Sequence, residues 1–196
     1  MKSLSKLLVG LVSLAVFGAA FGQAPVRVRG TITALNGDVL SVKDRGGKAL
    51  EIHLAPDAQI VTPKKVSADE FKEGSYVGVT SIQGPGGQLV AKRVHALGPQ
   101  VPQMHGDWDS IPHSKMTNAN IAGIAKVKGG TELTMKYKDG EQKILTNAKT
   151  EYYNFDKGSR DDLKPGAHIF TGAQNKEGQL VTGRVVVSKN GVNPPQ

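Results

Sequence analysis

Residues 87–96 read GQLVAKRVHA, and residues 178–187 read GQLVTGRVVV. Two further pairs of segments match in the same order: GDVLSV (37–42) with GTELTM (130–135), and FKEG (71–74) with LKPG (163–166). The three offsets are 93, 92 and 91 residues, so the spacing between matching segments is nearly constant. Self-similarity that keeps its order at a fixed spacing indicates that the chain contains two copies of one domain.

Within each copy, apolar and polar residues alternate along short stretches. Residues 26–29 read VRVR and residues 50–54 read LEIHL. A period of two predicts β-strands with one buried and one solvated face. Turn-forming clusters separate these stretches: NG (36–37), GPGG (84–87) and DG (139–140). The only helical indication is one brief capping pattern per copy, which begins at Ser67 and at Ser159.

These patterns predict an all-β protein made of two tandem small antiparallel OB-like β-barrels. A closed barrel is favoured over an open sheet because closure leaves no strand edge exposed to other chains. The repeat sets the expected boundaries: a first barrel over 25–98, a connector over 99–117, a second barrel over 118–189 and a flexible tail over 190–196. The connector contains several prolines and is expected to lack regular structure.

The N-terminus has the features of a secretory signal peptide. Basic residues precede an apolar run over residues 7–21, which is too short and wrongly flanked for a membrane-spanning helix. Small residues follow, with candidate cleavage sites after Gly22 and after Ala24, and the first is preferred because the second would leave Pro25 at the new terminus. We therefore expect residues 1–22 to be removed and the mature protein to be periplasmic or secreted, with no transmembrane segment.

Composition narrows the classes of function. The sequence contains no cysteine, which excludes a disulfide framework, a thiolate metal site and a cysteine nucleophile. The formal net charge of +8 is spread along the chain, which favours a solvated basic surface or attraction to anionic envelope polymers over nucleic-acid binding. The sequence holds no G-x-S-x-G, H-E-x-x-H or P-loop motif, so we expect a protein that is not an enzyme.

The connector concentrates residues of the types that bind metals. Residues 103–118 read QMHGDWDSIPHSKMTN and include Met104, His105, Trp108, His113 and Met116. Thioether and imidazole groups together favour Cu(I) or Ag(I), and the indole of Trp108 would lie over a bound cation. The alternative is a packing role, in which Trp108 forms a seam between the two barrels because indole combines a large apolar area with one polar N–H.

Other histidines and aromatic residues carry weaker indications. His53 and His95 fall on the polar faces of predicted strands, so both are expected to be solvated. The aromatic cluster at residues 152–155 is next to basic residues, as in base-stacking sites, but alternating aromatic residues in a strand are typical of a core. No nucleic-acid partner is therefore expected.

Several segments resemble one known family. GTITALNGDVLSVK (30–43), FKEGSYVGVT (71–80) and AKRVHAL (91–97) resemble the small β-barrel domain of unknown function that occurs singly or repeated in exported bacterial proteins. WDSIPHSKMTNANI (108–121) and LKPGAHIFTGAQNKEGQLVTGRVVV (163–187) resemble its two-domain members. The resemblance covers nearly the whole mature chain. It implies the fold and brings no catalytic residues.

A second, partial similarity concerns residue types alone. Periplasmic copper/silver efflux metallochaperones are small OB-like barrels that use one His, two Met and one Trp, types that are present here in His105, Met104, Met116 and Trp108. In that family the ligands project from barrel strands, whereas here they lie in the connector.

The expected function is that of an exported, non-enzymatic binding or interaction module of the cell envelope, whose ligand the sequence does not identify. One alternative is a periplasmic Cu- or Ag-binding protein that uses the connector. The other is a structural protein that contacts anionic envelope polymers.

Overall fold

The computed structural model describes residues 25–195, and the expected signal peptide lies outside this range. Twelve strands and three short 3-10 turns make up the fold. They are β1 (Val26–Asn36), β2 (Val39–Asp44), β3 (Ala49–Lys65), η1 (Ala68–Glu70), β4 (Tyr76–Gln83), η2 (Pro85–Gly87), β5 (Leu89–Ala96), β6 (Met104–Trp108), β7 (Ser114–Val127), β8 (Gly130–Tyr137), β9 (Gly140–Thr146), β10 (Glu151–Lys157), η3 (Arg160–Asp162), β11 (His168–Lys176) and β12 (Gln179–Val187). Over the described range, the structure contains no helix with the length and apolarity that crossing a membrane requires.

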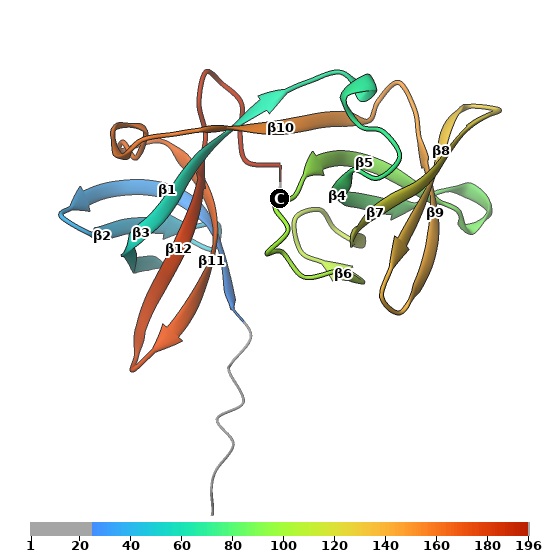
Figure 1. The fold of residues 1–196 in the computed structure, drawn as a ribbon. Helices are drawn as coiled ribbons and strands as arrows, with labels where there is room; N and C mark the ends of the chain where they lie inside the picture. The colour runs from blue at the N-terminus through green and yellow to red at the C-terminus, as the bar shows by residue number, and fades with distance from the viewer. Residues whose placement is uncertain (1–24, 196) are drawn as a thin grey trace, which may run out of the picture.

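The strands form two lobes, which lie side by side in Figure 1. Lobe 1 contains β1, β2, β3, β11 and β12, and lobe 2 contains β4 to β9. Strand β10 runs from one lobe to the other, next to the end of β3 (Figure 1). The end of the described chain lies between the two lobes.

Lobe 1 is a closed five-stranded β-barrel. Its strands pair in the order β12-β11-β1-β2-β3, and β3 returns to β12 through a parallel pairing. Alternate residues of these strands point inward and form one core, which includes Ile32, Leu40, Ile52 and Val185. The predictions of an all-β protein and of a β-barrel are therefore confirmed.

Lobe 2 repeats this path of pairings. Its strands pair in the order β5-β4-β7-β8-β9, and a short parallel pairing joins β5 to β9 at two positions, Leu89 with Ile144 and Val90 with Leu145. A separate core fills this lobe, with Val77, Ile121 and Met135 among its buried members.

The strand pairings do not follow the expected division into 25–98 and 118–189. Each lobe takes strands from both halves of the chain, because β11 and β12 complete lobe 1 whereas β4 and β5 complete lobe 2. The exchange arises because β3 continues beyond lobe 1 and its last residues pair with β10, so the chain enters the other lobe instead of folding back. The two lobes are therefore interlocked and do not follow one another along the chain.

The connector and the tail are also more regular than expected. Strand β6 and the start of β7 lie within residues 99–117 and pair from Met104 to Trp108. The prolines at 102 and 112 lie outside the paired residues, where a missing N–H costs no strand hydrogen bond. The tail folds against lobe 2, because the buried Pro195 accepts a hydrogen bond of 3.2 Å from Arg93 through its carbonyl oxygen.

Cutting the chain between its two halves is expected to leave them bound to each other. A protease recognition sequence inserted at the exposed Gln100 would separate β1–β5 from β6–β12, and each lobe would still hold strands of both fragments. Size-exclusion chromatography with light scattering should show one species of full mass after complete cleavage, and denaturant should release two fragments. Two separate species under native conditions would contradict the exchanged pairing.

Candidate functional site

Trp108 ends β6 and packs against lobe 1. Its ring centre is 4.1 Å from Cζ of Arg27 and 6.4 Å from the ring centre of Phe170. The pairing of Trp108 with Ser114 on β7 fixes the position of the indole. Trp108 therefore lies at the seam between the lobes. The guanidinium of Arg27 covers the indole ring, which was expected to lie over a bound metal cation.

Arg29 and Asp109 form an ion pair beside this indole. Arg29 is only 7% exposed, and its Nη1 donates a hydrogen bond of 2.7 Å to Oδ2 of Asp109. Arg27 lies on the same face of β1, with Nη1 3.6 Å from Oδ1 of Asp109. The carboxylate thus links two arginines of lobe 1 to the end of β6.

The environment shifts the pKa values of both partners. Burial lowers the pKa of Arg29, and the hydrogen bond with Asp109 opposes that shift. Burial by itself would raise the pKa of Asp109, but the hydrogen bond and the charge of Arg29 outweigh it, so this pKa is lowered. Both groups are therefore charged at neutral pH.

A cleft of about 820 Å³ opens beside the ion pair. A second cavity of about 300 Å³ shares Arg29, Asp44 and Arg45 with the first, so the two cavities are adjacent on lobe 1. We call the two cavities together the arginine groove. Its basic side chains are Arg27, Arg29, Lys43, Arg45 and Lys48, and its carboxylates are Asp44, Glu51 and Asp109.

The groove presents basic groups that are available to a ligand. Arg45 and Lys48 come from the turn between β2 and β3, and neither takes part in an ion pair within residues 25–195. Arg45 makes one long contact, 3.5 Å from Nη1 to the carbonyl oxygen of Ser110. Guanidinium groups match the geometry of carboxylate and phosphate oxygens, so this turn suits an anionic ligand.

The strand register brings two of the expected metal ligands, Met104 and Met116, to one face and places His105 on the other. Met104 and Met116 lie on one face of the β6–β7 pair, because Met104 is opposite Asn118 and Met116 is opposite Gly106. His105 points to the other face, where its Nδ1 is 2.9 Å from Oγ1 of Thr117 and its ring stacks on a tyrosine of β8. Burial lowers the pKa of His105, and the positive charge of Lys115 lowers it further.

His113 lies apart from the other three residues, in the exposed turn before β7, with φ of 57°. The four side chains are therefore not brought to one point. In the part of the chain that the structure describes, no three His, Asp or Glu side chains are placed to hold a metal ion.

Sequence reasoning missed the arginine groove. The alternation placed Arg27 and Arg29 on the solvated face of a predicted strand, whereas the structure buries Arg29 against Asp109. Two features could have indicated the contact: two arginines on one face of a strand, and the two carboxylates, Asp107 and Asp109, that flank Trp108 in the connector.

The expectation that His95 is solvated is wrong. His95 is 1% exposed, and Phe155 of β10 packs edge-on against its ring at 6.1 Å between ring centres. The polar face of β5 is covered because β10 crosses between the lobes at this point and pairs with β5 at Tyr153.

Comparisons with protein-family models, with curated proteins and with solved structures gave no match. The resemblance to exported small β-barrel proteins therefore stays an expectation. The indication of a ligand comes from the residues of the arginine groove.

Proposed function

We propose that the protein is an exported, non-enzymatic binding module of the cell envelope that holds anionic polymers in the arginine groove. The observation that carries this proposal is the set of five basic side chains that line two adjacent cavities of lobe 1. Basic groups spread over two adjacent cavities suit a chain molecule with repeated carboxylate or phosphate groups better than a compact ligand.

The inner part of the groove is organised in advance. Asp109 holds Arg27 and Arg29 in place, and the ring of Trp108 packs against Arg27. These long side chains therefore lose little conformational freedom when a ligand binds. Arg45 and Lys48 then supply the charge that meets the polymer. Attraction between exposed charges falls with ionic strength, so binding should be strongly salt-dependent.

The strand pairings support an OB-like architecture for both lobes. In each lobe a three-stranded meander is completed by a hairpin, and the last strand of that hairpin runs parallel to the third strand. Five-stranded OB-folds bind oligomers along one face, which agrees with a groove on the outside of lobe 1. The N-terminal apolar run supports export.

Replacing Arg45 and Lys48 together with glutamine is expected to weaken binding of alginate oligosaccharides, as a polyuronate probe, at least tenfold at low salt. Tenfold corresponds to about 1.4 kcal/mol, a plausible loss for two charge-assisted contacts. Isothermal titration calorimetry at several salt concentrations would measure the affinity and its salt dependence.

The matched control is a double variant of lobe 2, Lys136→Gln with Lys138→Gln, which removes the same charge from exposed positions outside the groove. It should bind the probe as the unmodified protein does. An equal loss in both variants would assign binding to net charge alone, and no binding by the unmodified protein would refute the proposal.

A further inference from the structure

Lobe 2 contains a cavity that the arginine groove does not involve. It has a volume of about 320 Å³ and lies between η1 and the β7–β8 hairpin. Its apolar wall includes Phe71 and Leu133, which belong to the core of lobe 2, together with Ile124. The core of lobe 2 therefore borders the cavity at this point.

At the corresponding end of lobe 1, a side chain bridges the equivalent elements. Arg160 of η3 donates hydrogen bonds of 2.8 Å to the carbonyl oxygen of Gly37 and 2.6 Å to Oδ1 of Asp38. This bridge ties the short 3-10 turn to the β1–β2 turn. By the offsets of the repeat, Arg160 corresponds to Ala68 and Asp38 corresponds to Thr131 in lobe 2.

Ala68 and Thr131 both line the cavity. A methyl group cannot span the distance that the arginine of lobe 1 covers, and neither residue carries a charge. The same architecture is thus bridged in one lobe and open in the other, and the difference comes from two side chains.

Apolar surface is exposed next to the opening. Ile124 of β7 is 38% exposed and is one of the three large apolar side chains that are exposed within residues 25–195, whereas Val127 points to the opposite face of the strand. Ile124 lines the cavity itself. A ligand with an apolar part would remove this surface from water, which is favourable.

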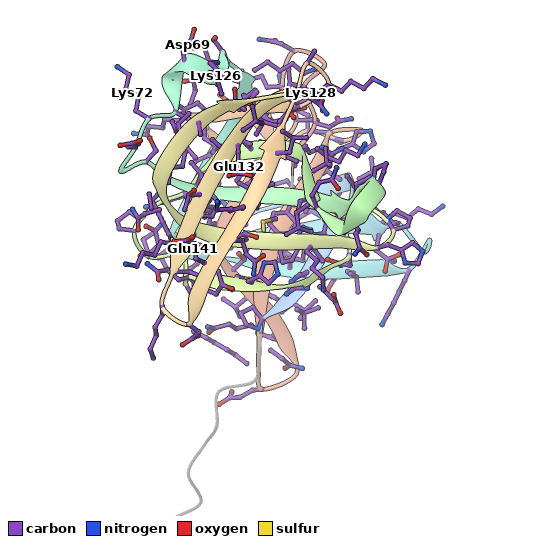
Figure 2. The ribbon with its side chains drawn as sticks, turned by 90° about the vertical axis from the view of Figure 1, so that its right-hand side faces the viewer. Asp69, Lys72, Lys126, Lys128, Glu132 and Glu141 are labelled. Carbon is purple, nitrogen blue, oxygen red and sulfur yellow. The ribbon has the colours of Figure 1, made fainter. Side chains whose placement is uncertain are left out.

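The rim of the cavity is basic. Lys72 and Lys126 line it and Lys128 follows on the same hairpin, whereas the carboxylates are Asp69, which lines it, and Glu73, which accepts a hydrogen bond of 3.3 Å from the N–H of Ile124. In Figure 2, Lys72, Lys126 and Asp69 surround the upper end of the lobe, and Glu132 and Glu141 lie further down the strands.

The rim lysines are free to meet a ligand. Within the described residues none of the three takes part in an ion pair, and Nζ of Lys126 donates a hydrogen bond of 3.3 Å to Oγ1 of Thr131. The opening therefore combines unpaired positive charge with an apolar wall.

We infer that this cavity binds a small anionic amphiphile, a molecule with one carboxylate or sulfonate and an apolar part the size of a short alkyl chain or a compact ring system. The apolar part contacts Phe71, Leu133 and Ile124, and the anionic group lies between Lys72 and Lys126. The volume is at the lower end of the range for ligand cavities, about 300–1,000 Å³, so long-chain lipids are too large to be enclosed.

Octanoate is a suitable probe, and octanol is its uncharged counterpart of equal chain length. Calorimetric titration of the full chain should show one octanoate per protein and an affinity for octanol at least tenfold lower. Replacing Lys72 and Lys126 with glutamine should lower the affinity for octanoate at least tenfold and leave that for octanol unchanged. Equal affinities for the two molecules, or no binding of octanoate, would overturn the inference.

A second variant rebuilds the bridge of lobe 1 in lobe 2. Ala68→Arg together with Thr131→Asp is expected to abolish octanoate binding while thermal unfolding stays cooperative. The control, Arg160→Ala with Asp38→Thr, changes the equivalent pair in lobe 1 and should keep octanoate binding in lobe 2. Octanoate binding that survives the rebuilt bridge would show that the ligand lies elsewhere. Alginate binding serves as a separate readout, because these lobe 2 changes should not affect the arginine groove.

Discussion

Replacing Gly30 with alanine is expected to lower the free energy of unfolding by about 3 kcal/mol, the upper part of the range for overpacked interiors. Gly30 lies in β1 and pairs with Asp44 of β2 on one side and with Ile169 of β11 on the other. An added Cβ would overlap the backbone oxygen of Lys43 and lie 2.6 Å from Cγ1 of Val42. Relief would require β1 and β2 to separate, which would open the barrel at this pairing.

The matched control for Gly30 is Gly183 of β12. A Cβ built at Gly183 meets no atom within 4 Å, so Gly183→Ala adds a methyl group to a strand of the same barrel without a clash. Its stability should stay within about 0.5 kcal/mol of the unmodified protein, as for most surface changes. Urea unfolding of the two variants measures the difference, and equal midpoints would contradict the close approach of β1 and β2.

Alternation of apolar and polar residues predicted most of the strands, because burial on one face of a strand is set by local sequence. Ile52 and Leu54, for example, are buried as their spacing indicates. The exchange of strands between the lobes has no corresponding pattern in the sequence. Strands β11 and β12 would bury the same side chains against either copy of the repeat, so the sequence pattern is identical for sequential and exchanged pairing.

The candidate site was less accessible to prediction because it depends on contacts between distant residues. The seam position of Trp108 follows from its size and its place in the connector. The burial of Arg29 could not be predicted in this way, because its partner Asp109 is 80 residues away in the sequence. The prediction that His95 lies on a solvated face was wrong for the same reason, because Phe155 reaches His95 only through the exchange of strands.

Acidification from pH 8 to pH 5 is expected to lower the free energy of unfolding by about 2 kcal/mol through His95 alone. Burial lowers the pKa of His95 to about 3, and the charges of Arg184 and Arg93 act in the same direction. In the unfolded chain the imidazole has a pKa of about 6.5. The unfolded state therefore takes up a proton first as the pH falls, and the folded state is disfavoured.

The contribution of neutral His95 is thus complete above about pH 6.5 and is lost as the pH falls towards 3, by about 1.4 kcal/mol for each unit. His95→Gln removes this titration, so the slope of stability against pH between 6.5 and 5 should flatten even if the variant is less stable throughout. His113→Gln replaces a histidine of an exposed turn and should keep the slope. Chemical unfolding at several pH values measures both. An unchanged slope in His95→Gln would show that protonation of His95 does not limit stability in acid. A flattened slope would locate the acid-sensitive contact beneath β10, where Phe155 covers the imidazole and the two lobes interlock.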